Sequence, residues 1–374
     1  MNTKALSVAA SLLAAAAAPA SAQTVRTVIS TTAPELSFEA ADALAPPADM
    51  HLGEVAGVAL NPKNGHLYVY QRGATSGPAY GAAASQLLEF DRAGKFVREI
   101  GKGLYAWSYA HNVRVDPQGN IWAVDKGSDM VIRFNPAGRV TMVFGRKSEA
   151  SDENAHPLER PRPPLPAVDG QFRQVTDIAW DSQGNGYISD GYINSRVAKV
   201  APDGRWLKSW GTFGKEPGQF DTLHSIQVAN DEVYVADRGN RRIQVFDTDG
   251  KLLRIIQINI AAPKGAPAAI GNMPRIADDG FTPQGAATMA PGAPWTLCIT
   301  PKDAAGKQTL FVSDAYPGRI YKMDLEGNVL GYFGSSGKQL KQFGWVHEIA
   351  CPSATELYVG ELLNWRLQKI TLRP

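Results

Sequence analysis

Three of the six histidines in the chain occupy the same position in a repeated sequence pattern. His111, His224 and His347 each stand two residues before the first inward apolar residue of a short strand-like run. Three imidazoles with an open fourth position make up a catalytic zinc site. One such histidine alone is most often a residue of a turn or of the core. Three at one repeated position indicate a shared metal site, provided that the fold brings the repeats together.

The repeats predict that fold. Six strand-like runs carry the repeated position, over residues 54–62, 108–116, 173–181, 223–231, 293–301 and 344–352. A second run follows each of them, over residues 65–73, 119–127, 184–192, 231–239, 307–316 and 356–363. D-G pairs at 203–204 and 249–250 mark hairpins further along two of the copies. Six four-stranded units without a competing helical period predict an all-β chain folded as a six-bladed β-propeller.

The histidine-bearing copies alternate around this ring with copies that carry other residues. The second, fourth and sixth copies hold the histidines, and the others hold Ala56, Thr176 and Trp295 at the same position. Alternate blades of a six-membered ring are related by a pseudo-threefold axis, and their innermost strands line the central channel. We therefore expect the three imidazoles to converge there and to bind zinc.

The ends of the second strands should meet at the same end of the channel, because each second strand runs antiparallel to the first. The residues directly after these strands are Arg72, Lys126, Gly191, Arg238, Ala315 and Leu362, and Tyr192 lies one step further in the third copy. Two guanidiniums and a phenol beside a metal favour a small-molecule or peptide-like anionic substrate. Turn chemistry in the run D-R-G-N-R-R-I (237–243) is the alternative for Arg238, and filling a turn is the alternative for Tyr192.

The last copy ends without a fourth strand. Its third strand lies in WRLQKITLRP (365–374), so the outer edge of this sheet would be exposed, and exposed edges promote aggregation. The β-prone segment TVRTVIS (24–30) lies outside the six copies. We predict that this N-terminal strand completes the last blade and closes the ring.

The N-terminus and the composition indicate the cellular setting. Residues 1–22 combine a lysine, an Ala/Leu-rich core and the small-residue pattern Ala20-Ser21-Ala22, which is typical of a cleaved signal peptide. Residues 23–374 would then form a single propeller domain in the periplasm or outside the cell. No other apolar run approaches the ~20 residues of a membrane span. The net charge of +2 and the scattered basic residues argue against nucleic-acid binding.

Strand parity predicts a disulfide between the two cysteines. Cys298 lies three residues beyond the repeated position of the fifth copy, and Cys351 lies four beyond that of the sixth. Residues of opposite parity point to opposite faces of a strand, as a bridge between neighbouring blades requires. Two buried free thiols are the alternative.

The chain resembles the NHL-type propeller of the peptidyl-α-hydroxyglycine α-amidating lyases, the peptidylamidoglycolate lyase family. The similarity runs from about Glu54 to Ile370 and rests on S-D-G-Y-I-N-S-R (189–196), L-H-S-I-Q-V (223–228) and V-A-D-R-G (235–239). The resemblance implies zinc ligands at His111, His224 and His347, a catalytic tyrosine at Tyr192, and catalytic, substrate-binding arginines at Arg72 and Arg238. The implied reaction cleaves a carbon–nitrogen bond of an α-hydroxyglycine to give an amide and glyoxylate.

The resemblance also implies a calcium ion in the channel. Its ligands would be the backbone carbonyls of Val58 and Val113 and the carboxylate of Glu348, where the family has an aspartate. The copper-dependent hydroxylating half of the animal enzyme has no counterpart in this chain, so a separate hydroxylating enzyme is a candidate partner. Two alternatives remain open: a zinc lyase or hydrolase for another α-hydroxy or sugar-derived acid, and a non-catalytic binding propeller.

Overall fold

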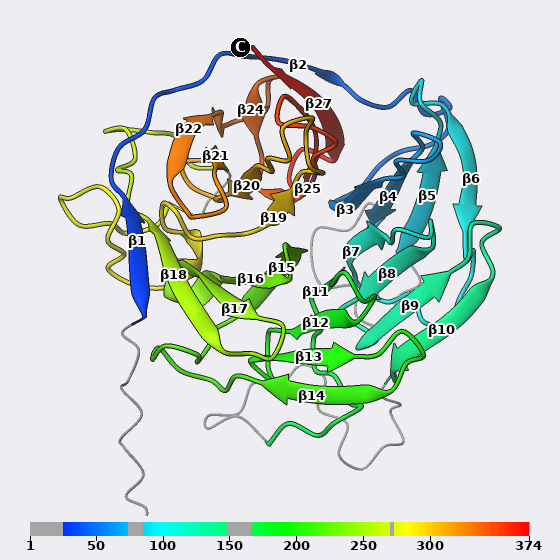
Figure 1. Ribbon diagram of the computed structural model, residues 1–374. Helices are drawn as coiled ribbons and strands as arrows, with labels where there is room; N and C mark the ends of the chain where they lie inside the picture. The colour runs from blue at the N-terminus through cyan, green and yellow to red at the C-terminus, as the bar shows by residue number, and fades with distance from the viewer. Residues whose placement is uncertain (1–24, 74–84, 148–165, 270–272, 374) are drawn as a thin grey trace, which may run out of the picture.

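The structure is a computed structural model that describes residues 25–73, 85–147, 166–269 and 273–373. These residues form six antiparallel sheets arranged radially around a central channel (Figure 1). Each sheet is one blade, with its first strand innermost. The predicted all-β, six-bladed propeller is confirmed.

Each of the first three blades consists of four strands that are consecutive in the chain. Blade one contains β3 (Val55–Leu60), β4 (Leu67–Gln71), β5 (Gln86–Phe90) and β6 (Phe96–Ile100). Blade two contains β7 (Ala110–Val115), β8 (Ile121–Asp125), β9 (Met130–Phe134) and β10 (Val140–Gly145). Blade three contains β11 (Asp177–Trp180), β12 (Gly186–Asp190), β13 (Arg196–Val200) and β14 (Trp206–Trp210).

The other three blades carry the additions to the basic unit. Blade four contains β15 (Leu223–Ala229), β16 (Glu232–Asp237), the 3-10 helix η1 (Arg238–Asn240), β17 (Arg242–Asp247) and β18 (Leu252–Ile258). Blade five contains β19 (Leu297–Ile299), β20 (Leu310–Ser313), β21 (Ile320–Met323) and β22 (Val329–Phe333), and the 3-10 helix η2 (Ala287–Met289) precedes it. Blade six contains β25 (Val346–Ala350), β26 (Glu356–Glu361) and β27 (Arg366–Leu372), and the short pair β23 (Ser335–Ser336) and β24 (Gln342–Phe343) comes before it.

The N-terminal chain closes the ring, but not with the segment that the sequence analysis chose. Strand β1 (Arg26–Ser30) pairs in parallel with β18 and adds a fifth strand to blade four. Strand β2 (Phe38–Asp42) pairs antiparallel with β27 and completes blade six. The prediction of an N-terminal closing strand is therefore correct, and its placement at residues 24–30 is wrong.

The chain between these strands follows the outside of the ring. Glu35 bridges to Tyr332 in blade five, and Ala45 bridges to Lys95 beside β6 of blade one. Figure 1 shows this blue segment running from β1 past blade five to β2. One N-terminal segment thus contacts blades four, five, six and one in succession. Strand β1 lies on blade four, and β2 covers the edge that blade six would otherwise leave open.

The core lies between neighbouring blades rather than within one layer. The second strand of each blade is buried along nearly its whole length, so both of its faces pack. Fully buried tyrosines stand in four of these interfaces, at Tyr70, Tyr187, Tyr234 and Tyr321. Their hydroxyls donate hydrogen bonds to the carboxylates of Asp125, Asp181, Glu232 and Asp314. Buried phenols are satisfied in this way without giving up apolar contact.

A disulfide joins blades five and six. Cys298 of β19 is bonded to Cys351, which directly follows β25, and their Cα atoms are 6.1 Å apart. Both residues are buried among apolar side chains of the two blades. The predicted signal peptide at residues 1–22 lies outside the described residues. No helix in the described part of the chain has the length and hydropathy to cross a membrane.

Candidate functional site

The three histidines are the second residues of three innermost strands. His111 lies in β7, His224 in β15 and His347 in β25. At each of them the pairing with the second strand shifts register, so the histidine has no partner in the ladder. An irregularity of this kind re-aims a side chain and is common beside active sites. All three shifts lie at the beginning of an innermost strand, β7, β15 or β25.

The imidazoles converge as the sequence analysis expects. Their candidate ligand atoms lie within 4.8 Å of one another, and the ring centroids are 4.7 to 4.8 Å apart. All three side chains are buried, with exposed fractions of 1 to 3%. The fold thus brings together residues that are 113 and 123 positions apart in the chain. These histidines could hold one metal ion.

Backbone carbonyls of the blades without histidines orient the three imidazole rings. Each Nδ1 atom lies within hydrogen-bond distance of the backbone carbonyl at the equivalent position of the next blade: His111 of Thr176 (2.7 Å), His224 of Trp295 (2.5 Å) and His347 of Ala56 (2.6 Å). A carbonyl only accepts, so each Nδ1 must carry the proton. The neutral ring then has its lone pair on Nε2, directed away from the carbonyl.

The remaining nitrogens fit a metal. Among the described residues, Nε2 of His111 and of His224 has no hydrogen-bond partner although both atoms are buried. Burial lowers the pKa of all three histidines well below the usual value, and positive charge nearby lowers it further. The rings therefore stay neutral. Three neutral imidazoles with fixed Nδ1 protons, two of them with a buried Nε2 that lacks a partner among the described residues, are a donor set that suits zinc.

Buried acids hold the loops at the mouth of the channel. Asp125, at the end of β8, accepts hydrogen bonds from the backbone of Ser108, Tyr109, Gly127 and Ser128. Asp237, at the end of β16, accepts from Asp221 N, Asn240 and Arg242. Because each acid directly precedes a mouth residue, Lys126 or Arg238, it fixes the backbone from which that cation projects. The fold places Arg72, Lys126, Tyr192 and Arg238 at the histidine end, as expected from the second strands.

Tyr192 lies between the histidines and the cations. Its ring centroid is 5.7 Å from that of His111 and 5.8 Å from that of His224. Arg238 Nη2 donates a hydrogen bond of 3.3 Å to its hydroxyl, and Lys126 Nζ lies 4.1 Å from the ring centroid. Burial raises the pKa of Tyr192, but the charges of Arg238, Lys126 and Arg72 together outweigh it and lower the pKa to about 8. A substantial phenolate fraction is therefore available near neutral pH.

The two predicted arginines have different surroundings. Arg72 donates from Nε to Ala110 O at 2.8 Å and from Nη1 to the carboxylate of Glu54 at 3.0 Å. Arg238 is also buried, but its Nε and Nη1 have no partner within the described ranges. Unsatisfied buried guanidinium N–H groups are unfavourable unless a ligand accepts from them. Arg238 is therefore the better placed of the two to bind a carboxylate.

Several side chains at the mouth carried no role in the sequence analysis. Arg72 lies 4.0 Å from the Tyr109 ring centroid, and Lys126 Nζ lies 4.6 Å from it. Arg238 lies 4.3 Å from the Trp295 ring centroid, and Trp295 packs against Trp345 at 5.6 Å. Cations and aromatic rings thus alternate around the opening. Usable signals were present for these residues: Lys126 directly follows its strand, Trp295 stands at the repeated position itself, and Tyr109 and Trp345 each stand two residues before a histidine.

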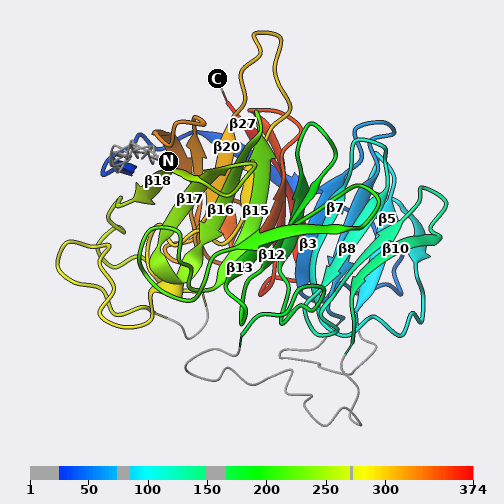
Figure 2. The same ribbon diagram turned by 60° about the horizontal axis from the view of Figure 1, so that its bottom comes forward.

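Part of the long connection between blades four and five borders this mouth. Trp295 Nε1 donates to the carbonyl of Thr288 in η2, and Met289 packs in the same cluster as Trp295. The turned view in Figure 2 shows the yellow chain before β19 folding beyond the ends of the sheets. The last turn of this connection, at Thr288 and Met289, therefore forms part of the rim of the mouth.

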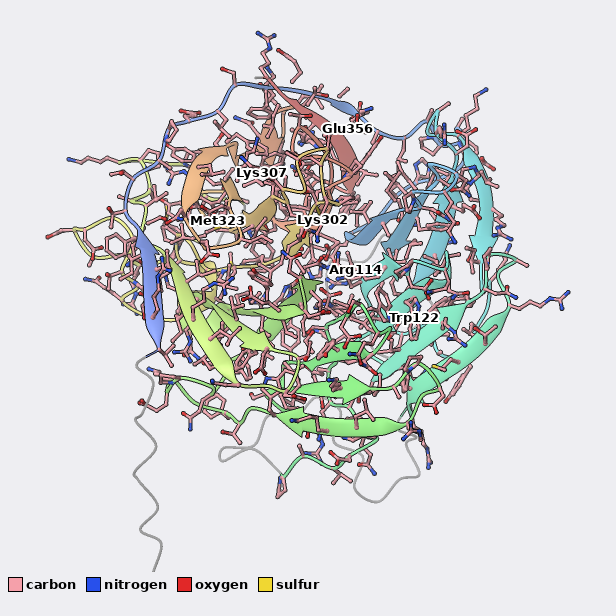
Figure 3. The ribbon with its side chains drawn as sticks, viewed as in Figure 1. Arg114, Trp122, Lys302, Lys307, Met323 and Glu356 are labelled. Atoms are coloured by element: carbon pink, nitrogen blue, oxygen red, sulfur yellow. A yellow bond between two sulfur atoms is a disulfide. The ribbon has the colours of Figure 1, made fainter. Side chains whose placement is uncertain are left out.

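Charged groups lie deeper in the channel than the histidines, with Asp177 and Glu348 one residue and Arg114 three residues after the repeated position. Arg114 of β7 forms a bidentate pair with Asp177, at 2.9 Å from Nε and 2.7 Å from Nη2. Its Nη1 lies 3.0 Å from Oε1 of Glu348. Figure 3 labels Arg114 near the centre of the ring. Burial raises the pKa of Glu348, and the Arg114 charge opposes this.

This deeper level does not fit the calcium ion that the resemblance implied. Val58 and Val113 lie in β3 and β7 as expected, and Glu348 follows His347 in β25. The Glu348 oxygen Oε1, however, already accepts from Arg114, from the Thr296 hydroxyl and from Ile349 N. Calcium requires six to eight oxygen ligands, and a guanidinium offers only donors.

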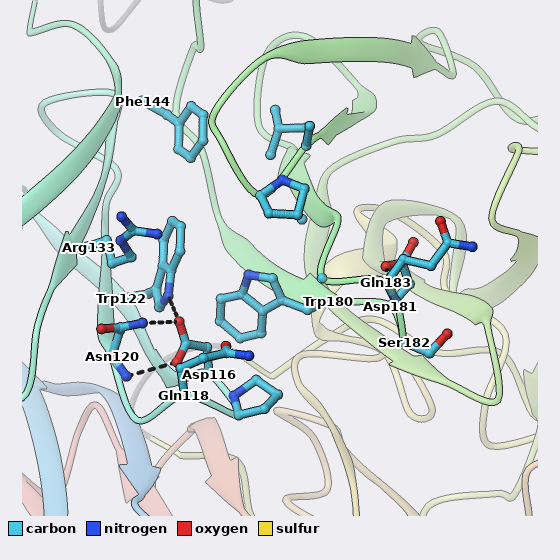
Figure 4. Close-up of a pocket in the computed structure, with 16 residues that line it drawn as sticks. Asp116, Gln118, Asn120, Trp122, Arg133, Phe144, Trp180, Asp181, Ser182 and Gln183 are labelled. Atoms are coloured by element: carbon cyan, nitrogen blue, oxygen red, sulfur yellow. Dashed lines mark hydrogen bonds between the residues drawn. The ribbon is translucent and has the colours of Figure 1, made fainter.

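A cavity of about 430 Å³ lies at the other end of the inner strands, between blades two and three (Figure 4). Trp122, Trp180 and Phe144 form its apolar walls, and the turn residues Asp116 and Ser182 lie at its rim. The carboxylate of Asp116 already accepts hydrogen bonds from Trp122 Nε1 and from Asn120 N. None of the predicted site residues lines this cavity.

Comparison with known proteins agrees with the resemblance read from the sequence. A peptidylglycine alpha-amidating monooxygenase of Rattus norvegicus is 29% identical over 223 residues, which cover 53% of this chain and 21% of that protein. A probable peptidyl-alpha-hydroxyglycine alpha-amidating lyase of Caenorhabditis elegans is 28% identical over 213 residues, covering 52% of this chain and 56% of that protein. NHL repeat-containing protein 3 of Mus musculus is 31% identical over 206 residues, covering 51% of each.

The chain is a homologue of the amidating lyases and of the NHL repeat-containing proteins. The aligned part spans about a fifth of the rat monooxygenase and about half of the nematode lyase. No protein-family model matches this NHL-type propeller.

Solved structures share the fold at low sequence identity. A streptogramin B lyase has a TM-score of 0.51 and 13% identity, and the match covers 90% of this chain and 98% of that one. An auxiliary nutrient binding protein from Bacteroides ovatus has a TM-score of 0.57 and 14% identity, covering 91% and 78%. One neighbour is named as an enzyme and the other as a binding protein, so the likeness supports the propeller alone.

Proposed function

We propose that this propeller is a zinc-dependent carbon–nitrogen lyase. Its substrate would be an α-hydroxyglycine-like carbinolamide, which it would cleave to an amide and glyoxylate. The observation that carries the proposal is the contact of Tyr192 with Arg238 beside three histidines whose candidate ligand atoms lie within 4.8 Å of one another. The similarity to proteins named amidating lyases supports the same reaction class.

Arg238 would bind the substrate carboxylate. Its Nε and Nη1 have no acceptor among the described residues, and a carboxylate can accept two parallel hydrogen bonds from one guanidinium. Arg72 is held by Glu54 and by Ala110 O, so it contributes fixed positive charge at the opposite side of the mouth. Binding at Arg238 places the adjacent carbinol carbon near Tyr192 and the histidines.

Tyr192 would accept the proton of the substrate hydroxyl. In R–CO–NH–CH(OH)–COO⁻ the C–N bond breaks as the carbinol O–H bond is lost and a C=O bond forms, which releases glyoxylate. The amide nitrogen takes up one proton, so the released amide and glyoxylate balance the substrate. The phenolate form of Tyr192, whose pKa is about 8, can take the hydroxyl proton, and the phenol so formed can give it to the leaving nitrogen.

The histidines would hold the metal at this point. A bound zinc would supply Lewis-acid chemistry to the substrate oxygen. The chain itself contributes neutral rings in fixed orientation, through the carbonyls of Ala56, Thr176 and Trp295. The surrounding aromatic and cationic side chains restrict water at the mouth and keep Tyr192 near the histidines.

The proposed setting is the periplasm or the extracellular space. The signal-like pattern in residues 1–22 and the bond between Cys298 and Cys351 support an oxidising compartment. A peptide substrate would need a hydroxyl group on its terminal glycine. A separate hydroxylating enzyme is therefore the proposed source of this substrate.

Metal analysis followed by an assay of α-hydroxyhippurate cleavage tests the proposal. We expect about one zinc per chain and release of glyoxylate and benzamide in equal amounts. Tyr192→Phe, with zinc retained, is the matched inactive control. Zinc-loaded protein that leaves α-hydroxyglycine derivatives intact would contradict the proposed substrate class, and a panel of other α-hydroxy and sugar-derived acids would then separate the alternative enzyme from a binding propeller.

A further inference from the structure

The layer of six residues one position after the histidine level includes a linked polar group of four, Asp177, Ser225, Thr296 and Glu348. The six are Gly57, Asn112, Asp177, Ser225, Thr296 and Glu348, one from each blade. Asp177 accepts from the Ser225 hydroxyl at 2.8 Å and from Ile226 N at 3.0 Å. Glu348 accepts from the Thr296 hydroxyl at 3.0 Å. Two acids in this layer thus receive hydrogen bonds from neighbouring blades.

Arg114 joins the two acids. Its side chain is 9% exposed, while Asp177 and Glu348 are 0% and 1% exposed. All three of its donor nitrogens are used, two for Asp177 and one for Glu348. Because Ser225 also accepts from Leu297 N at 3.1 Å, the network extends from blade two through blades three, four, five and six.

A divalent ion at these carboxylates would have to displace this guanidinium. The fixed charge of Arg114 would repel it, and the N–H groups of Arg114 cannot act as ligands. Between blades one and two, the backbones of β3 and β7 pack closely, because a Cβ added to Gly57 would lie 2.6 Å from Val113 N. The layer therefore already contains its cation and has little room between its first two blades.

We infer that Arg114 is the resident cation of the channel, replacing a divalent ion there and positioning the metal-binding histidines above it. Asp177 directly follows Thr176, whose carbonyl accepts from His111, and Glu348 directly follows His347. Arg114 lies three residues after His111 on the same strand. The clamp thus fixes the backbone beside two of the three histidines, and the protein needs no calcium to do so.

The wild-type protein gives the first test. Zinc-loaded protein is dialysed against about 1 mM calcium, a concentration that fills weak extracellular calcium sites, and then against calcium-free buffer before metal analysis. Thermal unfolding is recorded with and without calcium. We expect no retained calcium and an unchanged melting temperature. Retention of about one calcium per chain, with a higher melting temperature, would overturn the inference.

The Arg114→Gln variant gives the second test. It leaves two buried carboxylates without their cation, so we expect a melting temperature lowered by several degrees and recovered in part by calcium. Zinc affinity, measured by chelator competition, should fall by about tenfold, the effect of a lost supporting contact. Wild-type zinc affinity together with no response to calcium in this variant would contradict the inference.

Two further variants make the result specific. Arg254→Gln breaks a partly buried bidentate pair with Glu232 far from the channel, so it should lower stability without a calcium response or a loss of zinc affinity. Arg114→Lys keeps the charge and loses the bidentate geometry. We expect it to fold without calcium and to bind zinc more weakly than wild type, so the inference stays testable even if Arg114→Gln does not fold. None of these readouts depends on lyase activity.

Discussion

Two levels of one channel, only one to three residues apart on the inner strands, use opposite chemistry. At the upper level, His111 and His224 have buried Nε2 atoms without partners in the described structure. At the lower level, Arg114, Asp177 and Glu348 are buried to the same degree, yet their charges pair with one another. Burial alone therefore does not distinguish a functional level from a structural one.

The difference lies in what each level leaves unsatisfied. A buried polar atom without a partner is unfavourable unless a ligand completes it. The upper level is preorganised by outward hydrogen bonds to carbonyls and is open toward its centre. The lower level is closed on itself and holds the blades in place. Predictions that separate the two levels follow from this difference.

The largest effect is expected from neighbouring substitutions in β15. His224→Ala should reduce zinc from about one to below about 0.1 per chain and abolish turnover, because it removes one of three ligands. Ser225→Ala should keep the zinc but lower the free energy of unfolding by about 1 to 3 kcal/mol, because Asp177 loses a buried donor. Metal analysis and denaturant unfolding measure both effects. Full zinc occupancy in all three variants, His224→Ala, His111→Ala and His347→Ala, would show that the upper level does not bind the zinc.

Tyr192→Phe should reduce kcat by about 100-fold or more while zinc content and stability stay near wild type. The substitution removes only the hydroxyl that Arg238 contacts. Steady-state kinetics on α-hydroxyhippurate, with metal analysis of the same sample, measure the result. Near-normal kcat would show that another group accepts the proton.

The pH dependence should follow Tyr192 rather than the histidines. With a phenol pKa of about 8, the phenolate fraction rises with pH, so kcat should increase by about tenfold per pH unit below that value and level off above it. The histidines stay neutral throughout because burial lowers their pKa. The residual rate of Tyr192→Phe should lack this rise, and an unchanged rise in the variant would assign it to a different group.

The two arginines of the mouth should respond differently. Arg238→Ala should raise KM by about 10 to 100-fold with little change in stability, because its Nε and Nη1 make no bonds within the described chain. Arg72→Ala should instead lower the free energy of unfolding by about 1 to 3 kcal/mol, because it leaves the partly buried carboxylate of Glu54 without this partner and removes the bond to Ala110 O. Kinetics and urea unfolding of both variants give the comparison. Equal KM effects would mean that both arginines bind the carboxylate.

The smallest effect on the site is expected from the disulfide. Replacing Cys298 and Cys351 by serine should lower stability by at most about 4 kcal/mol, as expected for a closed loop of this size. Zinc content and kcat should not change, since the bond lies beyond both levels on the inner strands. Thiol titration of denatured, unreduced wild-type protein should find no free thiol. Two free thiols would contradict the bond.

The closing strand shows a limit of prediction from local sequence patterns. The segment TVRTVIS is rich in β-branched residues and has a buried Val28, so it was a reasonable choice for an edge strand. The actual closing strand has the sequence FEAAD, with low β propensity. It pairs there because the preceding chain is already held along blades four and five. Pairing between distant segments overrode local propensity.

The sequence by itself determined the six repeats, the alternation of histidines among them, and the mouth positions of Arg72, Tyr192 and Arg238. These features have a period that repeats along the chain, so their register can be counted without coordinates. Only the tertiary structure decided which carbonyls orient the histidines, that Arg114 bridges Asp177 and Glu348, and that two Arg238 nitrogens have no acceptor among the described residues. His347 and Ala56 are 291 residues apart, and such contacts form only when the ring closes. No local pattern encodes them, because each depends on where a distant strand arrives.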